Sequence, residues 1–148
     1  MFALINFFEI CLKYYDIDLN SFRLIGITGT DGKTSTATIT SLLLEDCAYI
    51  GTNGLTIRDK NYSLSNTTPC ISELYECFSK IQKAGIFTVV MEVSSHALKQ
   101  ERTYRLLYDA IGVTNITLDH LDYHKTIEDY IASKQKLLKL TKNNKICI

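Results

Sequence analysis

The sequence predicts an α/β protein built on a mostly parallel, P-loop-type sheet with helices on both faces. Short apolar segments rich in β-branched residues recur along the chain, and segments with helical spacing alternate with them. A glycine-rich run follows the first of these predicted strands. Strands that alternate with helices form parallel pairs, because each helix carries the chain back across the sheet. The 148 residues are enough for one domain with a sizeable core.

The first half of the chain starts with an apolar segment, MFALINFFEICLKYY, that could be mistaken for a signal peptide. It lacks a basic start and a cleavage site, and it is too short to span a bilayer. We therefore expect a buried or half-buried helix. In chain order the predicted elements are this helix over 1–15, a buried strand over 22–28, a helix over 33–46, a strand over 47–51 and a hairpin within 55–64 that turns at Asp59, Lys60 and Asn61.

The second half continues the alternation. The segment IFTVVMEV is the clearest buried strand, and two serines follow it as candidate helix caps. The predicted elements are a loop over 66–70, a helix over 71–85, a strand over 86–93, a short helix over 94–101, a strand over 108–115, a polar loop over 116–126, a helix over 127–140 and the beginning of a strand at 144–148. We expect 1–20 to be a leading helix and connector, and 21–148 to be a domain whose sheet is incomplete.

The composition limits the possible partners. The chain has 16 basic and 16 acidic residues, so its formal charge is zero, and nothing in this balance favours nucleic acid or an anionic membrane as a partner. Its five cysteines are odd in number and form no C-x-x-C pair. They are interpreted as free thiols in a reducing cytosol, which predicts a cytoplasmic protein.

The glycine-rich run is GITGTDGKTST, residues 26–36. A standard P-loop has four residues between its first glycine and Gly-Lys-Ser/Thr, and Ile27 occupies that first position here. Glycines still let backbone N–H groups approach phosphate oxygens, and the start of a helix adds partial positive charge. Lys33 can reach outer phosphates and the Thr34 hydroxyl can bind magnesium. The run predicts a nucleotide site; the alternative is a tight turn with a surface lysine.

Polar side chains stand at the carboxyl ends of two later strands. Glu92 ends the most apolar strand, and Asp119 and His120 follow the strand predicted over 108–115. Ligands gather at this edge of a parallel sheet, and a carboxylate in apolar surroundings is costly unless it is paired or binds metal. Together with Thr34 these residues predict a site for a hard cation. The alternatives are a helix-capping role for Glu92 and a polar loop role for His120.

Five segments together suggest a family. GITGTDGKTS, NTTP, MEVSSHALKQER, TNITLDHLDYHKT and YIASK occur in the order and approximate spacing of the Mur ligases, over about 21–139. The chain resembles the central, ATP-binding domain of these enzymes, and in particular the branch that adds the third residue of the peptidoglycan stem peptide. The loop of this family, G-x-x-G-T-N-G-K-T/S, has its additional glycine at the position of Gly29. Asp31 stands where the family usually has asparagine.

The resemblance implies an ATP-dependent, ADP-forming amide ligase. Its substrates would be ATP, the UDP-muramoyl dipeptide UDP-MurNAc-L-Ala-D-Glu and an amino acid, with Mg²⁺ as cofactor. The family has further N-terminal and C-terminal domains, so we expect this chain to be a fragment that is inactive alone. Two alternatives stay open: a non-catalytic nucleotide-binding remnant, or half of a split ligase whose C-terminal half is separately encoded; and a ligase of the folylpolyglutamate synthetase type.

The resemblance also implies roles for individual residues. Lys33, Lys134 and His120 would be catalytic, and Thr34, Glu92, His120 and Lys134 would bind magnesium. By its pattern alone Lys134 is a solvated helix lysine, but its counterpart in the family is carbamylated and binds a second magnesium ion. ATP would be held by Gly29, Thr30, Asp31, Gly32, Lys33, Thr34 and Ser35, and the UDP-muramoyl dipeptide by Asn66, Thr67, Thr68, Ser94, Gln100 and Arg102.

Overall fold

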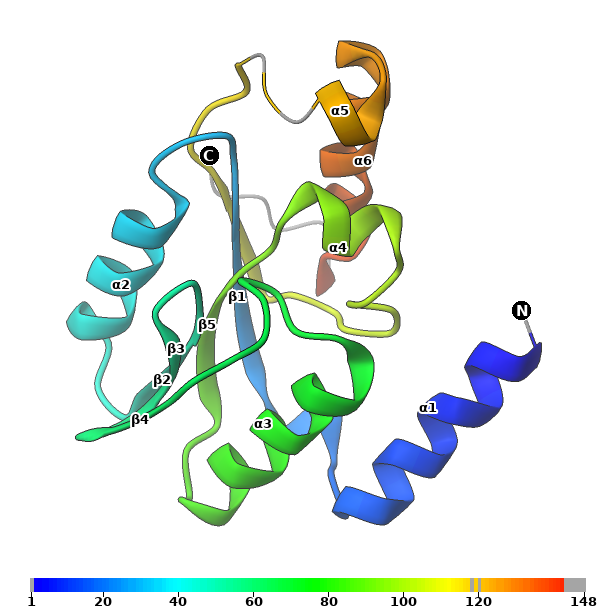
Figure 1. Cartoon of the computed structure of the whole chain (residues 1–148). Helices are drawn as coiled ribbons and strands as arrows, with labels where there is room; N and C mark the ends of the chain where they lie inside the picture. Colours follow the sequence, from blue (N-terminus) through cyan, green and yellow to red (C-terminus); the bar gives the residue numbers. More distant parts are fainter. Residues whose placement is uncertain (1, 118, 120, 143–148) are drawn as a thin grey trace.

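The computed structural model describes residues 2–117, 119 and 121–142, and it contains one six-stranded sheet (Figure 1). The strands are β1 (Arg23–Thr28), β2 (Cys47–Gly51), β3 (Gly54–Ile57), β4 (Lys60–Tyr62), β5 (Thr88–Glu92) and β6 (Ala110–Val113). The helices are α1 (Phe2–Tyr15), a 3-10 turn at Leu19–Ser21, α2 (Lys33–Leu43), α3 (Ile71–Lys83), α4 (Ser95–Lys99), α5 (Leu121–His124) and α6 (Ile127–Leu138).

The order of the strands is β4-β3-β2-β5-β1-β6. The pairs β2–β5, β5–β1 and β1–β6 are parallel, and the pairs β2–β3 and β3–β4, at one edge, are antiparallel. Strand β1 is therefore flanked by two strands, β5 and β6, that come from much later in the sequence. This arrangement confirms the prediction of a mostly parallel α/β sheet.

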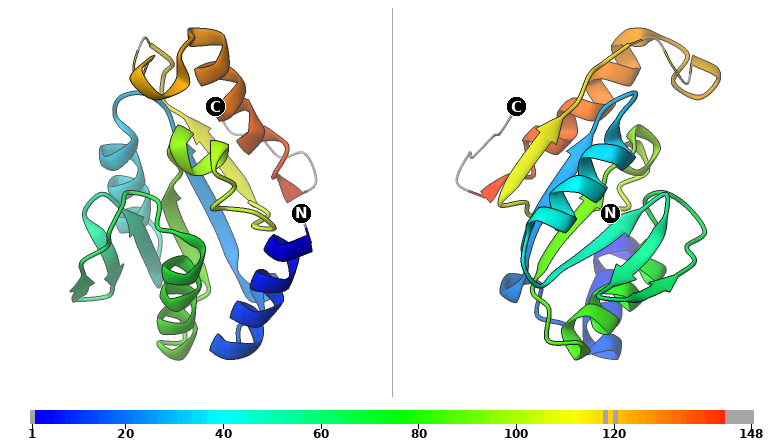
Figure 2. Two further views of the ribbon diagram at one scale, coloured as in Figure 1. Left: turned by 45° about the vertical axis from the view of Figure 1, so that its right-hand side comes forward. Right: turned by 90° about the vertical axis from the view of Figure 1, so that its left-hand side faces the viewer.

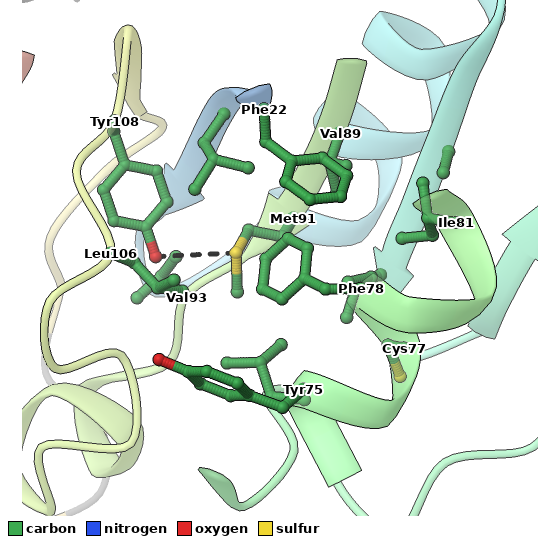
Figure 3. Packing of buried hydrophobic residues seen from close by; sticks show 14 of the residues in the cluster. Phe22, Tyr75, Cys77, Phe78, Ile81, Val89, Met91, Val93, Leu106 and Tyr108 are labelled. Atoms are coloured by element: carbon green, nitrogen blue, oxygen red, sulfur yellow. Dashed lines mark hydrogen bonds between the residues drawn. The ribbon is translucent and has the colours of Figure 1, made fainter. Parts of the chain in front are cut away.

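Helices cover both faces of this sheet, as the sequence predicts (Figure 2). On one face α2 packs over a small cluster that contains Ile27, Tyr49 and Val90. On the other face α1 and α3 cover the larger core. In that core Phe22 and Phe78 are in ring contact, and the Tyr108 hydroxyl donates to the Met91 sulfur at 3.5 Å (Figure 3).

The alternation of side chains along β5 explains how one strand serves both faces. Val89 and Met91 belong to the larger core, whereas Val90 faces α2. A strand buried on both sides is expected to be apolar, as this one is from Val89 to Met91. Glu92 therefore brings a carboxylate to the α2 face at the carboxyl end of the strand.

Three local features differ from the prediction. The segment 51–54 forms a tight turn between β2 and β3 that was not predicted; Gly54 has a φ of 100° there, which favours glycine. The next hairpin turns at Arg58 and Asp59, so Lys60 and Asn61 belong to β4 and not to the turn. The segment 116–126, expected to be a polar loop, contains the short helix α5.

The N-terminal segment forms a helix, as predicted, and it belongs to the main core. The Phe8 ring lies 5.4 Å from the ring of Tyr75 on α3, and Cys11 is buried in the same cluster. The strand expected at 144–148 lies outside the described residues, and the domain boundary at residue 21 stays a prediction. No helix in the described part of the chain is long and apolar enough to cross a membrane.

Candidate functional site

The glycine loop lies at the carboxyl end of β1 and leads directly into α2. Gly32 precedes the helix with a left-handed φ of 77°, which favours glycine. Gly29 has a φ of 150°, and a Cβ there would lie 1.9 Å from the Thr114 hydroxyl oxygen. The missing side chain of Gly29 thus makes room for the residue that follows β6. This contact explains the glycine at this position, for which the sequence suggested only a close approach to phosphate.

Asn115 and Thr114 hold the loop in shape, and sequence reasoning missed both. The Asn115 side-chain oxygen accepts from the backbone nitrogens of Thr30 and Asp31 at 3.2 and 2.9 Å. The Asp31 carbonyl oxygen accepts from the Thr114 hydroxyl at 2.6 Å and from the Asn115 amide at 3.2 Å. The available signal was the position of both residues just past the end of a predicted strand.

Two lysines donate to carbonyl oxygens of this loop. Lys33 Nζ lies 2.7 Å from the Thr30 oxygen, and Lys134 Nζ lies 2.7 Å from the Gly29 oxygen. Lys134 is only 3% exposed and its ammonium lies over the ring of Tyr130, so the interpretation as a solvated helix lysine was wrong. Burial, and secondarily the charge of Lys33, lowers the pKa of Lys134 to about 8.

The Glu92 carboxylate lies beside the first turn of α2. It is fully buried, and its Oε2 atom accepts from the Thr34 hydroxyl at 2.9 Å and from the Thr52 hydroxyl at 3.3 Å. The structure therefore brings together Thr34 and Glu92, two of the predicted cation ligands. Thr52, in the turn between β2 and β3, was not predicted because that turn was not.

The oxygen atoms at Glu92 and its hydroxyl neighbours are suitable ligands for a hard cation. Among the residues that the structure describes, no lysine, arginine or histidine nitrogen lies within 4.0 Å of this buried carboxylate, and carboxylate and hydroxyl oxygens suit magnesium. The same part of the chain contains no group of three or more His, Cys, Asp or Glu side chains able to hold a metal. Among the described residues, a magnesium ion here would thus depend on one carboxylate and the Thr34 hydroxyl, completed by water and phosphate oxygens. His120 lies outside the described residues.

The start of α2, just past the glycine loop, and most of the predicted substrate residues line one pocket of about 350 Å³. Arg102 donates to the Thr68 carbonyl oxygen at 2.8 Å, and the Thr68 hydroxyl accepts from the Ser94 backbone nitrogen at 3.0 Å. The lining residues are Lys33, Thr34, Thr52, Asn66, Thr67, Thr68, Ser94, His96 and Arg102.

Several predicted site residues do not line this pocket. They are Glu92, Lys134 and the loop residues Gly29, Thr30, Asp31 and Gly32, described above, together with Gln100 and Ser35. Gln100 accepts from the Arg102 side chain at 2.8 Å and so contacts the pocket through that arginine. Ser35 is exposed in the first turn of α2.

His96 was not predicted, although it lines the pocket. Its ring lies 4.1 Å from the ring of Tyr123 on α5, so the position of the imidazole depends on the short helix that was expected to be a loop. On the inner side of this contact the buried His124 ring nitrogen lies 2.9 Å from the Ser95 hydroxyl. The helix α5 therefore packs behind the part of α4 that lines the pocket.

Comparison with known proteins agrees with this geometry. The model of the family "Mur ligase middle domain" matches residues 27–148. The chain is 38% identical over 129 residues to a UDP-N-acetylmuramoyl-L-alanyl-D-glutamate--2,6-diaminopimelate ligase of Chlorobium phaeobacteroides, covering 84% of this chain and 25% of that protein. It is 42% identical over 125 residues to the ligase of the same name in Bacillus cereus, covering 82% and 26%.

A solved structure carries the same name. It superimposes with a TM-score of 0.73 at 31% identity, over 82% of this chain and 26% of that one. The chain thus spans about a quarter of the length of the curated relatives it matches. A family model that covers most of the chain, together with a glycine loop and pocket in the expected places, shows that this chain belongs to the Mur ligase family.

Proposed function

We propose that this chain supplies the ATP-binding part of a peptidoglycan-precursor ligase that acts in the cytoplasm. The complete reaction would join the D-Glu carboxylate of UDP-MurNAc-L-Ala-D-Glu to an amino acid, with ATP converted to ADP and phosphate. The observation that carries the proposal is the single pocket in which Lys33 and Thr34 stand beside Thr68, Ser94 and Arg102. The names of the relatives indicate 2,6-diaminopimelate as the amino acid.

The chemistry has two steps. An oxygen of the substrate carboxylate attacks the γ-phosphorus of ATP, the bond from that phosphorus to the bridging oxygen breaks, and ADP leaves with the electron pair. The amine nitrogen then attacks the acyl carbon, the bond from this carbon to the phosphate oxygen breaks, and the nitrogen loses a proton. Both steps need neutralised phosphate charge and aligned reactants more than covalent participation by the protein.

The residues in and around the pocket are suited to bind the phosphates of ATP and the anionic groups of the dipeptide. Backbone N–H groups at the start of α2 would bind the phosphates, and Lys33 would exchange the Thr30 carbonyl oxygen for a phosphate oxygen. Arg102, already fixed by Thr68 and Gln100, would pair with an anionic group of the dipeptide. The remaining predicted contacts to the dipeptide are Asn66, Thr67 and Ser94.

Thr34 and Glu92 would hold magnesium, with His120 and a modified Lys134 as further ligands. When bound, the metal would neutralise phosphate charge during transfer. In the protein itself, Thr34 lines the pocket and donates its hydroxyl to the Glu92 carboxylate behind it. The two side chains come from α2 and β5, so the site depends on the packing of that helix on the sheet.

Lys134 is placed to become a carbamate. Addition of CO2 needs the neutral amine, whose nitrogen forms a bond to the CO2 carbon and loses a proton. From a reference pKa near 10.4, neutralising a lysine at pH 7 costs about 4.6 kcal/mol, whereas from a pKa of about 8 it costs on the order of 1 kcal/mol. Burial of Lys134 therefore removes most of the free-energy cost of forming the neutral amine.

Binding is the property that tests this proposal on the chain itself. Isothermal titration with ATP and Mg²⁺ should give saturable heat for the wild type, and Lys33→Ala should weaken the binding by at least about tenfold. UDP-MurNAc-L-Ala-D-Glu should bind as well, and Arg102→Ala should weaken that binding while leaving the affinity for ATP unchanged. Lys60→Ala, on the distant edge strand β4, is the matched control. A chain that binds neither ligand would refute the proposal.

A further inference from the structure

The two oxygens of the Glu92 carboxylate have different surroundings. The Oε1 atom accepts from the Tyr49 hydroxyl at 2.5 Å and from the Thr52 backbone nitrogen at 2.9 Å. Among the described residues, the Oε2 atom accepts from two hydroxyl groups, those of Thr34 and Thr52, and both of these residues line the pocket. One oxygen is thus fixed toward β2, and the other points at the hydroxyl groups that separate it from the pocket.

The sheet places Tyr49 where it can make this contact. Tyr49 pairs with Val90 across β2 and β5, and Glu92 lies two positions further along the same face of β5. Gly51 is the residue between the tyrosine hydroxyl and the carboxylate. A Cβ at Gly51 would lie 2.3 Å from both the Tyr49 hydroxyl oxygen and Glu92 Oε1. The absence of a side chain at Gly51 is therefore what lets the hydroxyl reach the carboxylate.

The tyrosine hydroxyl is the donor in this contact. The Tyr49 side chain is only 4% exposed, and its hydroxyl lies 2.5 Å from the carboxylate oxygen, which accepts. The same hydroxyl accepts weakly from the Asn53 backbone nitrogen at 3.4 Å. Phenylalanine would fill the same space against α2 but has no hydroxyl to donate. Tyr49 therefore contributes a hydrogen bond to Glu92 in addition to its packing.

We propose that Tyr49 is a positioning residue for Glu92. By holding Oε1, it keeps Oε2 turned toward Thr34 and the pocket, where a divalent cation that accompanies a nucleotide would be bound. The inference rests on the proposed function for the presence of that cation. Groups that orient a metal-binding side chain commonly change metal affinity by about 10–100-fold when they are removed.

Manganese tests the proposal, because its complex with ATP can be compared with ATP alone. Isothermal titration of the intact chain with Mn·ATP should show an affinity about tenfold lower for Tyr49→Phe than for the wild type. The affinity for ATP in the presence of a metal chelator should be the same for both, because the glycine loop is untouched. Tyr62→Phe, which removes a hydroxyl from the edge strand β4, is the matched control and should bind as the wild type does. Equal Mn·ATP affinity for Tyr49→Phe and the wild type would overturn the proposal.

A second measurement needs no metal. The Thr52 amide donates to Glu92 Oε1, so its proton resonance reports where that carboxylate lies. In Tyr49→Phe the Thr52 amide should shift and exchange with solvent faster, whereas Tyr62→Phe should leave it unchanged. An unchanged Thr52 amide in Tyr49→Phe would show that Glu92 keeps its position without the tyrosine, and the proposal would be wrong.

These two measurements separate the inference from the function on which it rests. If the wild type binds no Mn·ATP, the proposed function fails, and the Thr52 amide still decides whether Tyr49 positions Glu92. If circular dichroism shows that Tyr49→Phe does not fold, Gly51→Ala takes its place. That variant keeps the hydroxyl but fills the space through which it reaches Glu92, so the same change at Thr52 is expected. An unchanged Thr52 amide in Gly51→Ala would refute the proposal.

Discussion

The ammonium of Lys134, on α6, lies 2.7 Å from the carbonyl oxygen of Gly29 in the glycine loop, although the two residues are 105 positions apart. A buried lysine therefore contacts the loop that would bind nucleotide. A change in the charge of Lys134 is therefore expected to change the conformation of the glycine loop. Two predictions about Lys134 follow from this geometry.

Lys134→Met is expected to stabilise the unmodified protein by about 1–3 kcal/mol at pH 7, because a buried charge is removed at the cost of one hydrogen bond. Below pH 8 both the folded and the unfolded state are protonated, so the penalty of the wild type is constant. Between about pH 8 and pH 10.5 the unfolded state binds a proton that the folded state does not, and the wild type gains stability. Urea unfolding in CO2-free buffer should show the difference shrinking over that range.

The exposed Lys136 on the same helix gives the control for this measurement. Lys136→Met should change the free energy of unfolding by no more than about 0.5 kcal/mol. If the difference between Lys134→Met and the wild type stays constant from pH 7 to about pH 10, the lowered pKa of Lys134 is wrong.

Carbamylation of Lys134 is expected when CO2 is supplied. With ¹³C-labelled bicarbonate, the wild type should give a carbamate carbon resonance that is absent in Lys134→Ala and present in Lys136→Ala. The modification turns the ammonium that donates to the Gly29 oxygen into an N–H that carries a carboxylate, so the Gly29–Thr30 amide resonances should shift together with it. A wild-type spectrum without a carbamate signal at saturating bicarbonate would rule the modification out for this chain.

Gly29→Ala is expected to destabilise the fold by more than about 2 kcal/mol, because its Cβ would overlap the Thr114 hydroxyl. Gly85→Ala is the control: its φ of 73° is also unfavourable for alanine, but no atom lies within 4 Å of the added carbon. It should cost about 1 kcal/mol. Adding Thr114→Ala to Gly29→Ala should recover part of the loss. Additive effects in this double-mutant cycle, measured by urea unfolding, would show that the two residues do not compete for space.

Asp31→Asn is expected to raise the affinity for ATP by about two- to fivefold, since it removes an exposed negative charge beside the phosphates. The backbone contacts of Asp31 to Thr114 and Asn115 do not involve its side chain and should survive the change. Isothermal titration at low and high salt checks this, because the gain should shrink as salt screens the charge. Asp59→Asn in the distant β3–β4 turn should leave the affinity unchanged, and a weaker binding of ATP by Asp31→Asn would contradict the expectation.

The parts of the fold that could be predicted are those with strong local patterns. The apolar run that forms β5 and the strand–glycine–helix order of β1 and α2 both have signals within about ten residues. The β2–β3 turn was missed because its defining residue, Gly54, follows a strand that already ended in a glycine. The alternation of apolar and polar residues after Gly54 then led us to place the hairpin later in the sequence. The helix α5 was missed because four residues are too few for a helical period to show.

Candidate site residues could be recognised in the sequence only where the side chain itself has a charged or metal-binding group. Lys33, Thr34 and Glu92 have charged or ligating groups at the expected edge of the sheet. Tyr49 looks like an ordinary core residue of an apolar strand, and its partner Glu92 lies 43 positions away. Its role can be seen only when the pairing of β2 with β5 is known.

The position of β1 between β5 and β6 has a consequence for how the site arises during folding. The complete glycine loop is present once the first 36 residues exist, but the groups that shape it, from Thr114 and Asn115, come some 85 positions later. Contacts between such distant segments form slowly, because a long stretch of chain must be closed first. A partly folded chain would therefore carry the full loop sequence without its geometry. Nucleotide capture should appear late, together with the last parallel strand pair, and a nucleotide that binds only the finished loop would favour the completed sheet over its precursors.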